Sequence, residues 1–250
     1  MKKVFAMVVL LMAVGCDTDS APDCFQATGS LVSETFVVPV FSKITIEEHV
    51  TLVVAQGEPQ EVSIETGENL LPDISVHVEN GTLYIVDGNN CNLMRDYGTT
   101  VARVTTPVLT EIRNSSSYDV RSAGTLRFPE LSLVSNSTVG PSEVRKGGDF
   151  YLDVACQQLS VEANGQSAFY ISGSTETARL SFSDEFPRFE GQQLQIGELN
   201  LFQRSANKMI VRPLRKISGE IRGTGDVISL FRPPIVEVES FFTGRLIFQD

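Results

Sequence analysis

Apolar residues that open strand-like segments recur at a nearly constant spacing along the second half of this chain. The last four intervals measure about 18 to 21 residues, whereas the 28 residues between Leu131 and Leu159 predict an insertion, around 145–149. Several repeats hold a second short apolar run about ten residues after the first, and such a pattern is typical of a solenoid. The first strands begin at Ile112, Leu131, Leu159, Leu180, Leu199, Ile217 and Val236.

Polar and apolar residues alternate within these first strands, which predicts which side chains face the core. Leu159, Val161 and Ala163 are expected to point inward, and Ser160 and Glu162 outward. Each coil then buries its apolar side only by stacking on its neighbours. A β-sandwich would also give short strands and frequent turns, but it offers no reason for a constant spacing. We therefore predict a parallel β-helix.

The first part of the chain, 31–110, has the pattern of short strands separated by turns, without a sustained helical period. Its strongest signal is Asn80-Gly81, which stands between the apolar runs 74–78 and 83–86. This dipeptide suits a type I′ turn, because both central residues of that turn need positive φ. We predict an all-β chain whose N-terminal β-hairpins join the same domain as the coils.

The first fifteen residues have the three parts of a secretory signal peptide. Lys2 and Lys3 give a positive start, residues 4–14 are apolar, and Gly15 precedes a polar stretch. The apolar run is shorter than the about 20 residues that a membrane-spanning helix needs. We predict a signal peptide over 1–15, a polar tether over 16–30 and one folded domain over 31–250.

The end of this signal, Ala13-Val14-Gly15-Cys16, resembles a lipobox, although the pattern usually has Leu where Ala13 stands. The resemblance implies transfer of diacylglycerol to the Cys16 thiol, cleavage before Cys16 and acylation of its new amino group. Several acyl chains together anchor a protein durably, whereas one chain binds a membrane only weakly. The alternative is an ordinary secretory signal with an incidental cysteine.

Three further cysteines, Cys24, Cys91 and Cys156, follow the predicted cleavage site. Export permits a disulfide, and at most one pair can form within this set of three. A bond from Cys24 to Cys91 would fasten the tether to the domain, but the sequence does not choose the partners. Buried, reduced cysteines are the alternative.

Charge is distributed unevenly along the chain, which has a net charge of −11. Residues 17–100 contain 14 acidic residues and only two basic ones, Lys43 and Arg95. Such an acidic half repels a phosphate backbone, so we expect no nucleic-acid partner.

A family resemblance extends over about 33–248 and is carried by three segments and one turn. These are 41–46, 50–57, 76–85 and Gly223-Thr224-Gly225-Asp226. They resemble the putative auto-transporter adhesin, head GIN domain family, which is common among lipoproteins of the Bacteroidetes. The resemblance implies a right-handed β-helix and a role in adhesion, and it transfers no site residue. Only this one Gly-x-Gly-Asp turn is intact in the chain.

The sequence holds no recognisable catalytic set, metal site or cofactor motif. His49 and His77 are the only histidines, and neither has a cysteine or a second histidine at ligand spacing. The turn at Gly223–Asp226 lacks the remaining residues of a dinucleotide or phosphate loop, so a β-turn between strands is expected. We predict no metal and no cofactor.

Three groups of side chains are candidates for ligand contact. Glu237 and Glu239 share a strand face about 7 Å apart, a geometry that suits glycosidic acid–base chemistry, although alternating glutamates more often serve solubility. Four basic residues form the one positive concentration, which suits acidic glycans or lipid headgroups, or else a solvated coil edge. An exposed Tyr170 or Phe241-Phe242 could partly replace tryptophan as a sugar platform, although core packing is the favoured expectation for the phenylalanines. The basic residues are Arg212, Arg215, Lys216 and Arg222.

These observations favour a cell-envelope lipoprotein with a non-enzymatic, adhesin-like or scaffold domain. Its expected partners are the membrane, through the lipid on Cys16, and a glycan or protein ligand. Asp17 and Asp19 after the lipid-bearing cysteine suggest the outer membrane, with the domain facing the periplasm or the cell surface. The alternative function is a polysaccharide-active enzyme, lyase- or glycosidase-like, on the same scaffold.

Overall fold

The computed structural model describes residues 24, 26–89, 91–93, 96, 98–137 and 145–249. The predicted signal peptide over 1–15, Cys16 as the predicted lipid-attachment residue and most of the predicted tether lie outside these ranges. Within them, no helix is long and apolar enough to cross a membrane.

The described chain consists almost entirely of strands, so the all-β prediction is confirmed. The 3-10 helix η2 (Leu71–Asp73) is a single turn. The strands are β1 (Leu31–Phe36), β2 (Lys43–Glu48), β3 (Thr51–Gln56), β4 (Glu61–Gly67), β5 (Ile74–Glu79), β6 (Thr82–Asp87), β7 (Val101–Thr106), β8 (Glu111–Ser116), β9 (Val120–Leu126), β10 (Glu130–Ser135), β11 (Phe150–Ala163), β12 (Ala168–Phe182), β13 (Arg188–Glu190), β14 (Leu194–Gln203), β15 (Met209–Val211), β16 (Pro213–Ile221), β17 (Val227–Ser229), β18 (Ile235–Ser240) and β19 (Leu246–Phe248).

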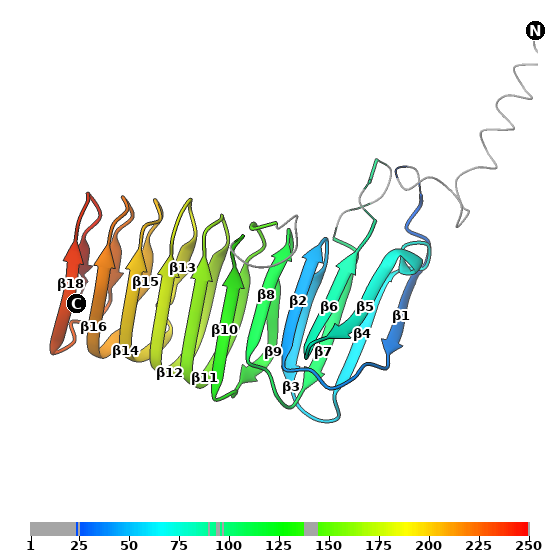
Figure 1. The fold of residues 1–250 in the computed structure, drawn as a ribbon, viewed down its shortest axis with the longest axis horizontal. Coiled ribbons are helices and arrows are strands. Elements are labelled where there is room, and N and C mark those ends of the chain that lie inside the picture. Colours follow the sequence, from blue (N-terminus) through cyan, green and yellow to red (C-terminus); the bar gives the residue numbers. More distant parts are fainter. Residues whose placement is uncertain are drawn as a thin grey trace, which may run out of the picture.

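Parallel strands from different parts of the chain stack side by side into two rows (Figure 1). Row A runs in the order β6, β2, β8, β10, β11, β12, β14, β16 and β18. Row B runs in the order β7, β3, β9, β11, β12, β13, β15, β17 and β19. β11 and β12 bend and contribute one half to each row, so both rows belong to one continuous sheet around a shared core.

The register of row A corrects two of the predicted strand starts. The other predicted strand starts align in one column of paired inward residues, which we call the inward rung. Ile112 pairs with Leu133 and Leu180 pairs with Val161, so each lies two residues beyond this rung. Ala178 occupies the inward position that the spacing predicts for Leu180. The sequence pattern misses Ala178 because it relies on large aliphatic side chains, whereas alanine is small. The aligned rung is Leu131, Leu159, Ala178, Leu199, Ile217 and Val236.

The N-terminal part contains the predicted β-hairpin. β5 and β6 pair antiparallel on either side of Asn80 and Gly81, whose φ angles of 49° and 75° are both positive, as a type I′ turn requires. β4 pairs antiparallel with β7 and with β1. These antiparallel strands lie at one end of the stack, next to β6 and β7.

The order of strands at this end does not follow the order of the chain. β2 lies between β6 and β8, and β3 lies between β7 and β9 (Figure 1). The chain therefore starts with β1 at the end of the stack, enters the stack at β2 and β3, runs out to the same end through β4–β7, and returns at β8 and β9 on the other side of its first coil. The spacing of residues along the sequence does not predict this arrangement.

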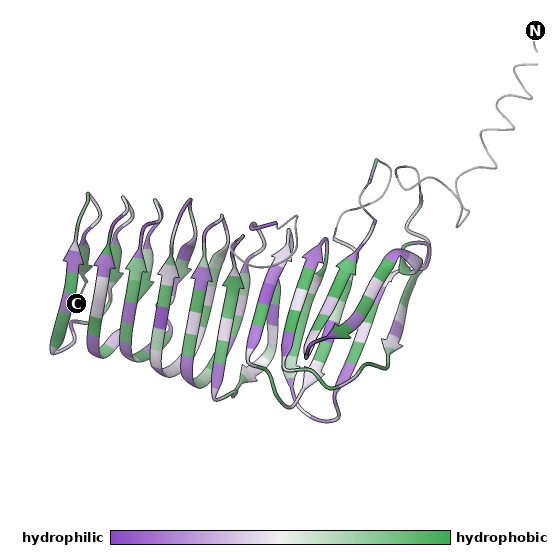
Figure 2. Ribbon diagram, viewed as in Figure 1, coloured by the Kyte–Doolittle hydropathy of each residue, from purple (hydrophilic) through white to green (hydrophobic). Residues whose placement is uncertain are grey.

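The core fills the space between the two rows. Leu159, Val161 and Ala163 are buried and Glu162 is exposed, so the predicted alternation is confirmed. Figure 2 shows the resulting bands of apolar and polar residues along the strands. The rings of Phe150 and Phe169 stack with centroids 4.7 Å apart in the middle of this core.

The last coil departs from the pattern of burial. Val236 aligns with the inward residue Ile217, yet 40% of its surface is exposed. Its exposure follows from its place, because no described strand packs on the far side of β18.

The predicted insertion lies between β10 and β11, and its described end packs against distant parts of the chain. An Arg145 guanidinium nitrogen lies 2.7 Å from Glu48 Oε2, and Lys146 Nζ lies 2.7 Å from Glu185 Oε1. These two ion pairs join the insertion to the end of β2 and to the loop that follows β12.

The structure joins Cys24 to Cys91 by a disulfide, and Cys156 is free. Next to the bond, the backbone N–H of Leu93 donates to the carbonyl of Cys24 over 3.1 Å. Burial raises the pKa of the Cys156 thiol, which keeps this side chain protonated and unreactive at neutral pH.

Peptide mapping of the full-length protein without reductant is expected to recover a peptide pair linked through Cys24 and Cys91. Substituting serine for either residue is expected to lower the free energy of unfolding by about 2–4 kcal/mol, because the cross-link restricts the unfolded chain. Cys156→Ser serves as the control and leaves the linked pair in place. Recovery of Cys156 in a disulfide would contradict this pairing.

Candidate binding groove

A groove of about 650 Å³ crosses the outer surface of row A from β8 to β16. It belongs to several coils at once and not to one loop. Its lining consists of Thr110, Glu130, Leu131, Ser132, Gln158, Leu159, Ser160, Thr177, Ala178, Arg179, Glu198, Leu199, Asn200, Lys216 and Ser218.

The groove is a consequence of strand alternation. The inward rung, for example Leu159 and Ala178, forms its floor, while the residues before and after it on each strand point outward. The surface is hollow there because several outward positions hold small side chains, such as Ser132, Ser160 and Ser218.

Two columns of side chains border the groove, with one residue from each strand and about 4.8 Å between strands. Ladder 1 comprises Glu130, Gln158, Thr177, Glu198 and Lys216. Ladder 2 comprises Ser132, Ser160, Arg179, Asn200 and Ser218. Ladder 2 thus offers hydroxyl, amide and guanidinium groups along a straight line.

At one end of the groove, the charged side chains are held in ion pairs. An Arg215 guanidinium nitrogen lies 3.5 Å from Glu198 Oε1, and Lys216 Nζ lies 2.6 Å from Glu237 Oε2. Along ladder 2, Asn200 Nδ2 donates to Ser218 Oγ over 3.3 Å. Most of the groove therefore offers neutral hydrogen-bonding groups.

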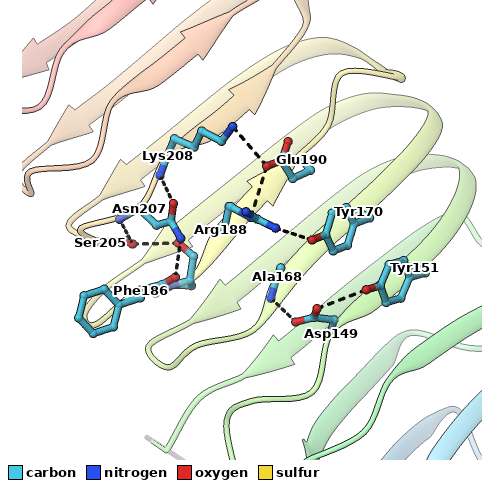
Figure 3. A network of polar contacts seen from close by, with 11 residues as sticks. Asp149, Tyr151, Ala168, Tyr170, Phe186, Arg188, Glu190, Ser205, Asn207 and Lys208 are labelled. Carbon is cyan, nitrogen blue, oxygen red and sulfur yellow. Dashed lines mark hydrogen bonds and ion pairs between the residues drawn. The ribbon is translucent and has the colours of Figure 1, made fainter.

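Row B carries a stack of aromatic rings on its outer side (Figure 3). The rings of Tyr151 and Tyr170 are nearly parallel, with centroids 4.7 Å apart. The Arg121 guanidinium covers Tyr151 at 4.3 Å from the ring centroid, and that of Arg188 lies 5.6 Å from the Tyr170 centroid. The ring of Tyr170, considered as an exposed sugar platform, is half-buried, because Tyr151 stacks on it and Arg188 contacts its hydroxyl.

Polar contacts hold this stack to the turns beside it (Figure 3). The Tyr151 hydroxyl donates to Asp149 Oδ2 over 3.4 Å, and the guanidinium of Arg188 donates to the Tyr170 hydroxyl. Arg188 and Lys208 both pair with Glu190. Because these groups satisfy one another, we assign them a structural role.

Asp149 connects two coils. Its Oδ1 accepts the backbone N–H of Ala168, 19 residues further along, over 2.7 Å. Loss of hydration on burial raises the pKa of the Asp149 carboxyl, and the charge of Asp119 raises it further, against the lowering effect of the Ala168 and Tyr151 hydrogen bonds. Ionised Asp149 therefore carries a cost in the folded protein.

Asp149→Asn is expected to raise the melting temperature at pH 7, because the amide oxygen still accepts the Ala168 hydrogen bond and no charge is buried. A raised native pKa means that the folded state binds more protons, so the contribution of Asp149 to stability falls as pH rises. The gain should therefore vanish below the ordinary value of 3.8.

Asp149→Ala is the matched control. It removes the acceptor, leaves the N–H of Ala168 without its partner, and should destabilise the protein by about 1–3 kcal/mol. Thermal unfolding of both variants, at pH 7 and below pH 3.8, measures these two effects. An asparagine variant that is no more stable than the wild type at pH 7 would contradict this role.

The Gly-x-Gly-Asp segment is a turn, as predicted. It stacks closely on the turn of the preceding coil, with the N–H of Gly225 donating to the Ser205 carbonyl over 3.1 Å. A Cβ at Gly225 would lie 1.8 Å from the Asn207 carbonyl oxygen, so the backbone approach requires glycine. Asp226 Oδ1 accepts the N–H of Arg245 over 2.8 Å, which joins this turn to the next coil.

The two histidines lie apart, each beside a tyrosine. His49 makes an edge contact with Tyr118 at 6.2 Å between centroids, and His77 stacks on Tyr84 at 5.3 Å. Across the described ranges, no group of three or more histidine, cysteine or acidic side chains is placed to hold a metal ion.

The predicted basic concentration is not a single patch, and this expectation is wrong. Arg215 and Lys216 lie near the start of β16 and pair with acidic residues, whereas Arg222 follows its end, about 20 Å away along an extended strand. Arg222 pairs with Glu220, and Arg212 precedes β16 and is exposed. Extended backbone separates residues that are close in sequence.

Glu237 and Glu239 are both exposed on β18, at the far edge of row A. Glu237 pairs with Lys216, and neither glutamate lines the groove. Phe241 and Phe242 are also exposed, and the guanidinium of Arg222 covers the Phe241 ring at 4.0 Å. These candidates do not converge on one site.

Sequence reasoning missed the groove itself. Its residues come from five strands and from Thr110 before β8, and they become neighbours only through the register of row A. The recurrence of serine, arginine and asparagine one position after the inward rung is the signal that would have indicated ladder 2.

Several solved structures share this fold. An adhesin described as putative from Bacteroides fragilis is 17% identical, with 89% of this chain and 99% of that chain covered and a TM-score of 0.78. Another such adhesin, from Parabacteroides merdae, is 16% identical, with 90% and 98% covered and a TM-score of 0.60. A protein named as a putative lipid binding protein, from Parabacteroides distasonis, is 14% identical, with 90% and 99% covered and a TM-score of 0.61.

No curated protein matches the sequence. The sequence profile of one family covers residues 40–233, which is most of the chain. The chain therefore belongs to the family described as putative auto-transporter adhesin, head GIN domain.

Proposed function

We propose that this protein is a non-enzymatic, adhesin-like module of the cell envelope that binds an extended ligand in the groove of row A. The observation that carries the proposal is the groove itself, in which a straight line of outward polar side chains is held by several stacked coils. Strands in a hydrogen-bonded stack are a rigid support, so this surface is organised before a ligand arrives. Membership of an adhesin-like family supports the same function.

The lipid on Cys16 is the proposed anchor, and the outer membrane is the proposed location. The described chain begins beside Cys91, at the end of the stack that carries β1, β5 and β6. A tether from that end would leave the outer surface of row A accessible along its length. Cys16→Ala is expected to release the protein into the soluble fraction and to abolish palmitate labelling, whereas unchanged membrane association would contradict the anchor.

We also propose that the stacked coils form a right-handed parallel β-helix. Parallel pairing of coil upon coil, together with the strong preference of parallel crossover connections for one hand, supports a right-handed parallel β-helix.

No observation favours the alternative of a polysaccharide-active enzyme. Glu237 and Glu239, the pair considered for acid–base chemistry, are exposed and lie outside the groove. A glycosidase needs two carboxyl groups on opposite sides of the bond that breaks. The groove instead has Glu198 bound to Arg215 and Glu130 on a distant strand of the same ladder.

The proposal is tested by blocking the groove. Ser160 lies on ladder 2 in the centre of row A, and Ser160→Trp places a large side chain in the groove without entering the core. Cells that display the full chain would be applied to surfaces coated with a panel of glycans and matrix proteins. We expect the coated surfaces to retain cells that display the wild type. The number of retained cells that display the Ser160→Trp variant should be lower by about tenfold or more.

Gln166→Trp is the matched control, because this residue is exposed on the turn between β11 and β12 and lies outside the groove. Its retention should equal that of the wild type. Equal retention of the Ser160→Trp variant would contradict the proposed binding surface.

A further inference from the structure

Arg179 is an exposed cation within the groove. It belongs to ladder 2 on β12, between Ser160 and Asn200 on the neighbouring strands. Within the ranges that the structure describes, its guanidinium has no hydrogen bond, ion pair or ring contact. All five guanidinium N–H donors are thus free to contact a ligand.

Other arginines of the described chain do not share this combination. Arg215 and Lys216, at the end of the groove, are held by acidic partners. Arg127, Arg204 and Arg212 also lack such partners among the described residues, but none of them lines the groove. Arg179 is therefore the groove residue best placed to recognise an anionic group.

The surroundings of Arg179 limit the charge of the ligand. Its neighbours along ladder 2 are neutral hydroxyl and amide groups, whereas Glu130 and Glu198 lie on ladder 1. The chain as a whole carries a net charge of −11. A densely charged polyanion would be repelled, while one carboxylate would meet a planar guanidinium that can bind it with two parallel hydrogen bonds.

The chemistry of the lining favours a glycan over a peptide. A peptide that adds a strand needs an unpaired sheet edge, but β11, β12 and β14 each pair with strands on both sides. The outward residues of the lining are hydroxyl, amide or charged side chains, so the groove offers hydrogen bonds in place of apolar pockets. A chain of sugar hydroxyls matches such a row.

We infer that the groove binds a linear glycan that is mostly neutral and carries isolated carboxylate sugars, with Arg179 as the residue that recognises the carboxylate. This inference rests on the proposed function, since it names the ligand class of the same groove. Two strands on either side of Arg179 contribute to ladder 2, so hydroxyl groups on both sides of the acidic sugar have partners.

The test compares three immobilised glycans with the full chain in detergent. The first is a linear glycan with one carboxylate sugar in each repeat of several sugars, the second is its carboxyl-reduced counterpart, and the third is polygalacturonate. The wild type should bind the first glycan about tenfold more tightly than the other two, which is the size of effect expected from one charge-assisted contact. Added salt should reduce this preference, because the Arg179 contact is exposed.

Three variants decide the outcome. Arg179→Gln should bind the acidic glycan as weakly as the wild type binds the neutral one, Arg179→Lys should keep part of the preference, and the control Arg204→Gln should keep all of it. Arg204 is exposed and follows β14, about 13 Å along the chain from Asn200.

The two proposals fail in different ways. A preference that survives Arg179→Gln, tightest binding to polygalacturonate, or binding to none of the three glycans would overturn the ligand class. Ser160→Trp cells that are retained as well as the wild type would overturn the binding surface itself.

Discussion

Phe169→Ala is expected to lower the free energy of unfolding by about 4 kcal/mol, because it removes a fully buried ring from the centre of the core. The Phe169 ring stacks on Phe150 at 4.7 Å and contacts Phe182 at 5.8 Å between centroids. These rings come from both rows. The cavity that Phe169→Ala leaves would therefore loosen the contact between the two rows. The stacked coils cannot close such a space without shifting the strands that hydrogen-bond to their neighbours.

Thermal unfolding followed by circular dichroism measures the effect, and the melting temperature should fall by about 10 °C. Phe186→Ala is the matched control, since the same atoms are removed from a ring that is 56% exposed on a turn. Its effect should stay within about 0.5 kcal/mol. Similar losses for the two variants would contradict a core that is centred on the Phe169 stack.

Gly225→Val is expected to destabilise the protein by about 3 kcal/mol, because the new side chain has no room. A Cβ at this position would lie 1.8 Å from the Asn207 carbonyl oxygen and 2.9 Å from that of Ser205. Both contacts are with backbone, which cannot rotate away as a side chain can. Relief requires the turns of two successive coils to separate, which breaks the Gly225 N–H bond to Ser205.

The neighbouring residue gives the comparison. Thr224 is exposed in the same turn, so Thr224→Ala should change the free energy of unfolding by less than about 0.5 kcal/mol. Hydrogen exchange should show the loss in Gly225→Val first at the N–H of Gly225 and Gly244, which bond to the preceding turns. A fully stable Gly225→Val protein would show that the turns are not in close contact.

Local patterns in the sequence predict much of this fold. The alternation around Leu159 and Val161 predicts which side chains are buried, and Asn80-Gly81 predicts the hairpin between β5 and β6. These features depend on residues that are neighbours in the chain, where period and turn chemistry act directly.

Features that depend on pairing between distant residues are not predicted in the same way. The place of β2 between β6 and β8 follows from which strands pair, and no pattern within β2 states its partners. Ala178 shows the same problem on a smaller scale, since only the register with Leu159 and Leu199 identifies it as the inward residue.

The candidate site depends most on such pairing. Arg179 and Ser160 become neighbours because two strands align, whereas Arg212 and Arg222, which are closer in sequence than many of the groove residues, lie before and after the same strand. Side chains that line a face across several coils are therefore recognised only once the register is known.

Retention without cleavage tests the central claim most directly. The full chain would be incubated with the carboxylate-bearing linear glycan, and bound glycan and new reducing ends would be measured in the same sample. We predict that the glycan is retained by the wild type, is released by Ser160→Trp, and gains no reducing ends. New reducing ends that form with the wild type and disappear in Glu237→Gln or Glu239→Gln would contradict a non-enzymatic binding module.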